Sequence, residues 1–308
     1  MRFTSLRWDL SNDPDAGWKA VDWSVHTHQA TVRGRRINYA DIGSGPVAVL
    51  LHGQGGSWQW WLRVLPTVSA HRRVIAVDLP GFGGSDPIAA GDVFSEHVAT
   101  IIGLLDHLGL ADAIIAGHSM GGLVALQVAC DHPDRVAGLV LIDAGGANIS
   151  AARLALIVTG LRAFNRVFAI PWVPRVVARK RYLRSSLMAL ALHDPGTLST
   201  SLAMEILPRM AAPGFVQSLH AAAIAVNRVT PHAVTCPSLI LWGVRDRILP
   251  VSTGHVLASK IPDARFVPLE NVGHCVMVEA ADHFSQLLID FTQTPEHRAR
   301  CQLAPNWV

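Results

Sequence analysis

Short runs of consecutive apolar residues, many of them β-branched, recur along this chain of 308 residues. Uninterrupted runs of this kind are typical of strands that are buried on both faces of a sheet. They lie at residues 47–51, 73–78, 113–116, 136–142, 238–242 and 265–269. Helix-like segments separate them, among them residues 95–108, 120–131 and 275–291. The alternation predicts an α/β fold in which helices cover both faces of a mostly parallel central sheet.

A long segment in the second half of the chain interrupts this alternation. Residues 147–232 are helical in pattern throughout and contain several prolines. We expect them to form a helical cap, inserted over the carboxyl ends of the strands, where open α/β folds bind their ligands. The α/β core then comprises residues 29–146 and 233–295.

The two ends of the chain lie outside this pattern. Residues 1–28 form a polar leader that carries Trp8, Trp18 and Trp23, and residues 296–308 form a C-terminal tail. Between the leader and the first buried run, two short alternating stretches on either side of Gly34 predict a β-hairpin.

Composition excludes several classes of protein. Half of the residues are hydrophobic and 16% are charged, which indicates a folded globule rather than a disordered chain. The net charge of +3 is too small to indicate a nucleic-acid partner. The four cysteines match neither a zinc site nor a disulfide scaffold, and no spacing suggests a metal or cofactor. Without a secretory or membrane-spanning run, we expect a cytoplasmic protein.

One motif predicts a catalytic nucleophile. Residues 117–121 read Gly-His-Ser-Met-Gly, directly after a predicted strand and directly before a predicted helix. In this context G-x-S-x-G places the serine on a tight turn with its hydroxyl exposed. Ser119 is therefore the candidate nucleophile, and the backbone N–H of Met120 is a candidate donor to an oxyanion. The alternative is a glycine-rich turn that contains a serine by chance.

A serine hydroxyl needs a base, and two later loops supply candidates. His274 follows the last predicted strand, and Asp246 follows the strand before it. The order Ser119, Asp246, His274 is the order expected when G-x-S-x-G belongs to a catalytic triad of this kind. Asp143, which follows an earlier strand, is the alternative acid, but the loop around Asp246 favours Asp246.

The remaining site residues are predicted from neighbouring positions. The loop after residues 47–51 should provide the second oxyanion donor, and we assign it to the N–H of Gln54. Trp58, His118 and Trp242 lie close in sequence to these loops and are predicted to contribute to substrate binding.

Together these motifs resemble the α/β-hydrolase superfamily. The resemblance rests on His52-Gly53, residues 78–85, residues 117–122, Asp246 and Gly273-His274, and it extends over about residues 31–291 apart from the cap. It is strongest to the lid-bearing branch of esterases, monoacylglycerol-lipase-like enzymes and C–C bond hydrolases. Epoxide hydrolases and haloalkane dehalogenases of this superfamily carry aspartate at the nucleophile position, so Ser119 excludes them.

The resemblance implies a serine hydrolase without a cofactor. Our first expectation is an enzyme that cleaves a carboxylic ester of a fairly apolar acyl group through an acyl-enzyme. The alternative is a C–C bond hydrolase acting on a vinylogous keto acid, although such enzymes usually carry Gly-Pro-Gly where this chain has residues 54–56 as Gln-Gly-Gly. A second alternative is a ligand-binding or sensor protein without catalytic activity.

The cap has a composition of its own. Residues 149–231 contain nine arginines and one lysine, but only Asp194 and Glu205 as acids, and many apolar residues lie between the charges. A basic, apolar helical segment predicts a lid that screens a lipid-like substrate or rests on a membrane surface. Alternatively, its apolar face packs on the core and its arginines are merely solvated.

Overall fold

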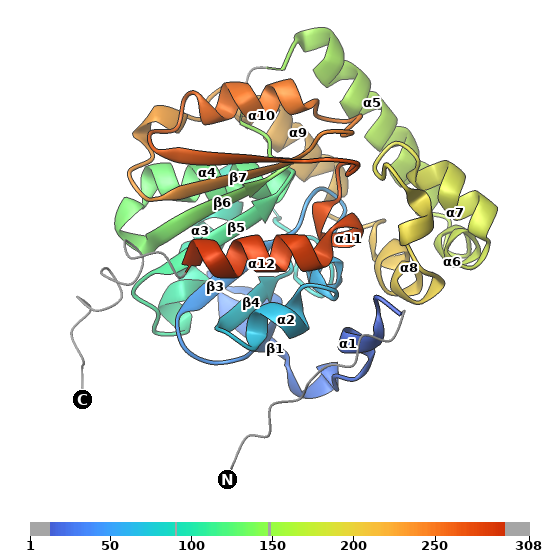
Figure 1. Ribbon diagram of the computed structural model, residues 1–308, viewed down its shortest axis with the longest axis horizontal. Helices are drawn as coiled ribbons and strands as arrows, with labels where there is room; N and C mark the ends of the chain where they lie inside the picture. Colours follow the sequence, from blue (N-terminus) through green and yellow to red (C-terminus); the bar gives the residue numbers. More distant parts are fainter. Residues whose placement is uncertain (1–12, 90, 147–148, 293–308) are drawn as a thin grey trace.

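The computed structural model describes residues 13–292 apart from residues 90, 147 and 148. It has one eight-stranded sheet with helices on both faces (Figure 1), so the predicted fold class is confirmed. The strands are β1 (Thr27–Val32), β2 (Arg35–Ile42), β3 (Val47–Leu51), β4 (Arg73–Val77), β5 (Ala113–His118), β6 (Val136–Ile142), β7 (Ser238–Gly243) and β8 (Ala264–Leu269). The C-terminal tail predicted at residues 296–308 lies outside the described residues.

The strand order places the parallel strands together. The order is β1-β2-β4-β3-β5-β6-β7-β8. The predicted hairpin is β1 and β2, which pair antiparallel to each other, and β2 joins β4 antiparallel. All other pairs are parallel. The carboxyl ends of β3, β5, β6, β7 and β8 therefore meet at one edge of the sheet, as the site requires.

Both faces of the sheet are covered, which explains the uninterrupted apolar runs. In β3, Val49 and Leu51 pack in one core cluster, while Ala48 and Leu50 pack in the other. The first cluster includes residues of α3 (Val93–His107), α4 (Met120–Asp131) and α10 (Val251–Ala258). The second includes residues of α2 (Leu65–Ser69), α11 (Val276–Glu279) and α12 (Ala281–Thr292). Because successive side chains of a strand point to opposite faces, every position in β3 needs an apolar residue.

The last helix differs from the prediction. We expected one helix over residues 275–291, but the structure has α11 and α12, separated at Ala280. Ala280 has φ −134° and ψ 43°, which are not helical values. Its carbonyl accepts a hydrogen bond from the N–H of Phe284, in the first turn of α12. Apolar periodicity alone did not reveal this break, because both helices present apolar residues to the same cluster.

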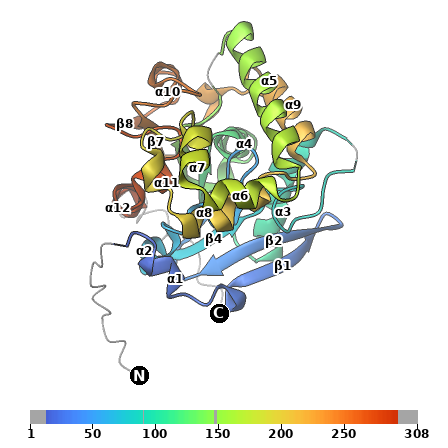
Figure 2. The same cartoon turned by 90° about the vertical axis from the view of Figure 1, so that its right-hand side faces the viewer.

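The segment between β6 and β7 is helical. It contains α5 (Ala151–Phe168), α6 (Val173–Arg179), α7 (Arg181–Met188), α8 (Thr200–Ile206) and α9 (Phe215–Ala225). Figure 2 shows α5, α6 and α7 as an outer layer in front of the sheet. Among the described residues no single helix is long and apolar enough to cross a membrane; α5 and α6 meet the length and composition test only as a pair, bent by 95°.

The expected leader is packed against the rest of the protein over its described part. It contains α1 (Ala16–Lys19), and β1 begins within it. Asp15 is fully buried and forms an ion pair with Arg63, with 2.8 Å between Oδ1 and Nε. Arg63 Nη1 also donates to Val278 O, and the Ser199 hydroxyl of the cap donates to Asp15 Oδ2. This one carboxylate therefore connects the leader, the core and the cap.

We predict that Asp15→Ala lowers the free energy of unfolding by about 3–5 kcal/mol, because it leaves the buried guanidinium of Arg63 without its partner. Urea denaturation followed by circular dichroism measures the change. Glu270→Ala, which removes an exposed carboxylate outside this ion pair, is the control and should leave the urea midpoint unchanged. Equal midpoints for Asp15→Ala and the wild type would contradict this role of Asp15.

Candidate active site

Ser119 lies on a tight turn between β5 and α4, as its motif predicts. Its backbone has φ 53° and ψ −115°, a strained conformation for a residue with a side chain. The turn is possible because glycine flanks it. A Cβ at position 117 would lie 2.2 Å from Gly121 O, and a Cβ at position 121 would lie 2.4 Å from His52 O. Close packing of glycine backbone thus holds the hydroxyl at the carboxyl edge of the sheet.

The structure brings Ser119, His274 and Asp246 together. His274 Nε2 lies 3.0 Å from Ser119 Oγ, and His274 Nδ1 lies 2.7 Å from Asp246 Oδ2. The other carboxylate oxygen of Asp246 accepts the N–H groups of Ile248 and Leu249, at 2.7 Å and 2.9 Å. In this geometry the carboxylate of Asp246 orients the imidazole ring, and Nε2 of His274 is placed to take the proton of the serine hydroxyl.

The alternative acid, Asp143, lies close by but has a different environment. It is fully buried, and its Oδ1 accepts the N–H of Gly243 at 2.8 Å. Burial, followed by the nearby charge of Asp246, raises the pKa of Asp143 well above its usual value. The imidazole of His274 bonds to Asp246, whereas the carboxylate of Asp143 bonds to the backbone of β7.

Asp143, Asp246 and His274 also offer ligand atoms within 4.8 Å of one another, the kind of cluster that can hold a metal ion. Both ring nitrogens of His274 are already engaged, however, one by Asp246 and one by Ser119. The hydrogen bonds of the triad therefore explain why Asp246 and His274 lie together.

His118 contacts the backbone of His274, the proposed base. It is buried, and its Nε2 lies 2.7 Å from the backbone carbonyl of His274. Burial lowers the pKa of His118 well below its usual value, so the ring is neutral and donates its Nε2–H to that carbonyl. The structure places His118 where it positions the backbone of His274, and its predicted role in substrate binding stays a prediction.

The loop after β3 lies against the nucleophile. A Cβ at position 53 would lie 3.1 Å from the Cβ of Ser119. His52 holds this loop, since its Nδ1–H donates to Gly53 O and its Nε2 accepts Leu79 N–H, at 2.8 Å and 3.0 Å. The Gln54 side chain donates to Phe215 O of α9 at 2.7 Å, which ties the loop to the cap. The oxyanion roles of the Gln54 and Met120 N–H groups remain predictions consistent with this placement.

Sequence reasoning did not identify the role of His52. The signal was present, since His52 follows β3 directly and precedes the first of the loop's glycines. Its hydrogen bond to the loop after β4 required the strand order, which places β3 beside β4.

Trp242 is a core residue, so its predicted contact with substrate is wrong. Its side chain is fully buried in the first core cluster, and its indole N–H donates to Leu249 O at 2.9 Å. It packs under α10, because a Cβ on Gly254 would lie 2.6 Å from the indole ring.

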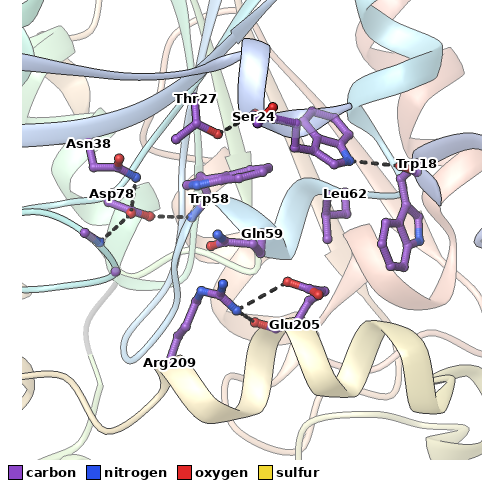
Figure 3. A pocket seen from close by; sticks show the side chains of 13 residues that line it. Trp18, Ser24, Thr27, Asn38, Trp58, Gln59, Leu62, Asp78, Glu205 and Arg209 are labelled. Carbon is purple, nitrogen blue, oxygen red and sulfur yellow. Dashed lines mark hydrogen bonds and ion pairs between the residues drawn. The ribbon is translucent and has the colours of Figure 1, made fainter. Parts of the chain in front are cut away.

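Trp58 lines a pocket that does not include the triad. It lines a pocket of about 560 Å³ together with Trp18, Trp23 and Arg209 (Figure 3), and its ring centroid lies 5.3 Å from that of Trp23. Its backbone N–H donates to Asp78 at 2.7 Å. None of the three triad residues lines this pocket. The leader tryptophans thus help to form a cavity between the core and the cap, which the sequence did not indicate.

With this geometry established, known proteins identify the family. A family model described as the alpha/beta hydrolase fold matches residues 46–281. The chain belongs to the α/β-hydrolase family. It is 34% identical over 272 residues to a dihydrolipoyllysine-residue acetyltransferase component of an acetoin cleaving system from Pseudomonas putida, covering 85% of this chain and 68% of that protein.

Two further relatives carry names of one enzyme class. The 2-hydroxy-6-oxononadienedioate/2-hydroxy-6-oxononatrienedioate hydrolase 1 of Dechloromonas aromatica (strain RCB) is 31% identical, with 83% of this chain and 90% of that protein covered. The solved meta-cleavage product hydrolase of Pseudomonas fluorescens IP01 superposes with a TM-score of 0.70 at 25% identity, over 86% of this chain and 96% of that one. This α/β-hydrolase is therefore similar to C–C bond hydrolases.

We predict that Asp246→Asn lowers kcat by on the order of a thousandfold or more, because the amide no longer fixes the imidazole tautomer or stabilises its cation. Asp143→Asn is the matched control: it changes a buried carboxyl that bonds to Gly243 N–H while His274 bonds to Asp246, and it should leave kcat close to that of the wild type. Steady-state kinetics on any turned-over substrate measures both. A larger loss for Asp143→Asn than for Asp246→Asn would make Asp143 the acid of the triad.

Buried histidines predict acid sensitivity of the fold. Burial lowers the pKa of His52 to about 4 and that of His97 to about 3, from 6.5 in the unfolded chain. Between pH 6.5 and about 4 the unfolded state binds more protons at these two sites, so stability falls as the pH falls. Each histidine contributes up to about 1.4 kcal/mol per pH unit. Urea denaturation across this window should show a shallower slope for His97→Gln; an unchanged slope would contradict the assignment.

Proposed function

We propose that this α/β-hydrolase cleaves a C–C bond next to a carbonyl group in a vinylogous keto acid, with Ser119, His274 and Asp246 as its catalytic triad. The observation that carries the proposal is the pair of contacts at His274, to Ser119 Oγ and to Asp246 Oδ2. The names of the relatives support a C–C hydrolase more than an esterase. The chain is a hydrolase by family, and the bond that it cleaves is the proposal.

The reaction consumes one water molecule. The 2-hydroxy-diene form of the substrate first becomes its keto form, in which the hydroxyl has lost a proton and the carbon next to the carbonyl has gained one. Two steps follow. Ser119 Oγ attacks the carbonyl carbon while its proton passes to His274 Nε2. The adjacent C–C bond breaks, its electron pair enters the conjugated acid, and His274 returns the proton to that fragment at carbon. The acyl group remains on the serine. Water then gives its hydroxyl to the acyl carbon, releasing a carboxylic acid, and its proton returns to Ser119 through His274.

The negative charge that develops on the carbonyl oxygen needs donors. We propose the N–H groups of Met120, at the start of α4, and of Gln54, in the loop against Ser119. The first N–H groups of a helix lack partners within the helix, so they are available to an oxyanion. A missing donor in such a site costs on the order of a hundredfold in kcat.

An ester hydrolase with the same triad is the second candidate. It is favoured by residues 54–56, which read Gln-Gly-Gly where C–C hydrolases usually carry Gly-Pro-Gly. The first step is the same for an ester, except that an alkoxide leaves in place of a carbon fragment. A binding or sensor protein without activity fits less well, because it does not need a base within hydrogen-bond distance of the serine.

The test compares two substrates on the full-length protein. A 2-hydroxy-6-oxo-2,4-dienoic acid loses its conjugated absorbance on cleavage, and a nitrophenyl ester of a short acid releases nitrophenol. We expect a higher kcat/KM for the keto acid, and a loss of at least about a thousandfold for Ser119→Ala. Ser252→Ala, which changes an exposed serine of α10, is the control and should be fully active.

Each other outcome has a definite meaning. Turnover of the ester with none of the keto acid would replace the proposal by the ester hydrolase. Equal rates for Ser119→Ala and the wild type on both substrates would remove Ser119 from catalysis.

A further inference from the structure

Helix α5 carries many apolar residues on the side that faces solvent. Its inward side chains Leu154, Ile157, Val158, Leu161 and Phe164 pack against the first core cluster. Its exposed residues are Ala151, Ala152, Ala155, Leu156, Thr159, Gly160, Arg162, Ala163, Arg166 and Val167. A surface helix usually carries charged and polar residues on its solvent side, and a helix that is apolar all round is usually buried. The solvent side of α5 instead carries mostly apolar residues, with Thr159, Arg162 and Arg166 as its polar and charged members.

The apolar surface continues beyond α5. The loop after it exposes Ile170 and Trp172, and the latter side chain is 64% exposed. Tyr182 on α7 is 68% exposed, and Leu156 on α5 is 73% exposed. These residues lie on α5–α7, the layer that Figure 2 shows in front of the sheet. We call the exposed residues of positions 151–182 the cap ridge.

The charges on the cap ridge all have one sign. From residue 151 to residue 193 the chain has no aspartate or glutamate. The exposed cations of the ridge are Arg162, Arg166, Arg175, Arg179, Lys180 and Arg181. The ridge therefore combines exposed apolar and aromatic side chains with a single-sign positive potential, with no carboxylate on the segment to neutralise it.

We propose that the cap ridge binds the surface of an anionic lipid bilayer. Apolar and aromatic side chains enter the boundary between headgroups and acyl chains, while arginine and lysine contact the phosphates. The helices lie on the surface and do not cross it, since α5 and α6 are bent by 95° and no single described helix passes the test for a span. This goes beyond the proposed reaction and does not depend on it.

A second copy of this chain fits the ridge less well than a bilayer. In a two-fold dimer the same patch meets itself, so each cluster of cations would face another. Like charges brought together in this way disfavour the contact. An anionic bilayer instead supplies the opposite charge over the whole length of the ridge.

The test is sedimentation of the full-length protein with vesicles. We expect binding to vesicles of phosphatidylglycerol mixed equally with phosphatidylcholine, little binding to phosphatidylcholine alone, and loss of binding at high salt. The triple variant Arg175→Gln, Arg179→Gln, Lys180→Gln should bind about a hundredfold more weakly. Trp172→Ala should weaken binding several-fold, because it removes the most exposed indole of the ridge.

A matched triple variant controls for total charge. Arg33→Gln, Arg36→Gln and Arg265→Gln together remove three exposed cations outside the cap and should leave binding unchanged. No binding of the wild type to the mixed vesicles would overturn the proposal, and so would equal weakening by the two triple variants. Light scattering that shows a dimer broken by Trp172→Ala, without vesicle binding, would assign the ridge to a second copy.

Because hydrolysis of a water-soluble substrate needs no vesicles, it is measured on the same variants. An inactive enzyme whose ridge still binds vesicles would refute the proposed function alone. An active enzyme that binds no vesicles would refute the membrane proposal alone.

Discussion

The site depends on how His274 is held, because every part of the proposed chemistry passes through its imidazole. Its ring contacts Asp246 on one side and Ser119 on the other. Its backbone carbonyl accepts from His118, and its backbone N–H donates to Ala191 O of the cap at 2.8 Å. The ring orientation is therefore set by the core and by the cap together.

The cap segment around Ala191 is attached to the catalytic loop at further points. Glu279 accepts Gly273 N–H on one carboxylate oxygen and Asp194 N–H on the other, at 2.7 Å and 2.8 Å. The backbone also approaches closely, since a Cβ at position 273 would lie 2.6 Å from His193 N. This part of the cap is built into the site, and displacing it would release the backbone of the base.

The triad was predictable from sequence because its geometry follows from topology. The carboxyl ends of parallel strands meet at one edge, so the loops after β5, β7 and β8 converge whatever the lengths of the segments between them. The choice between Asp143 and Asp246 was less certain in sequence, since both follow strands. It is decided by hydrogen bonds: two N–H groups and the imidazole bond to Asp246, whereas Asp143 is buried and accepts the N–H of Gly243.

The side-chain directions at the ends of strands were not predictable in the same way. Trp242 lies at the carboxyl end of β7, close to the loop that carries Asp246. The alternation of side chains along β7 nevertheless points it into the core beneath α10. Trp58 lies only a few residues after the loop that touches Ser119. Its backbone N–H nevertheless bonds to Asp78, and its ring packs against that of Trp23. Nearness in sequence to a catalytic loop says nothing about the side of the loop on which a ring packs.

The cap composition raised two readings of its apolar residues, packing on the core or contact with a lipid phase. Helix α5 carries apolar residues of both kinds: Leu161 and Phe164 pack on the core, while Leu156 and Val167 are exposed. The ridge lies on α5–α7, which form the outer layer in Figure 2, while the hydrogen bond to His274 N–H comes from the carbonyl of Ala191, after α7. Binding a surface through the ridge, as we propose, would therefore leave the hydrogen bonds of His274 in place.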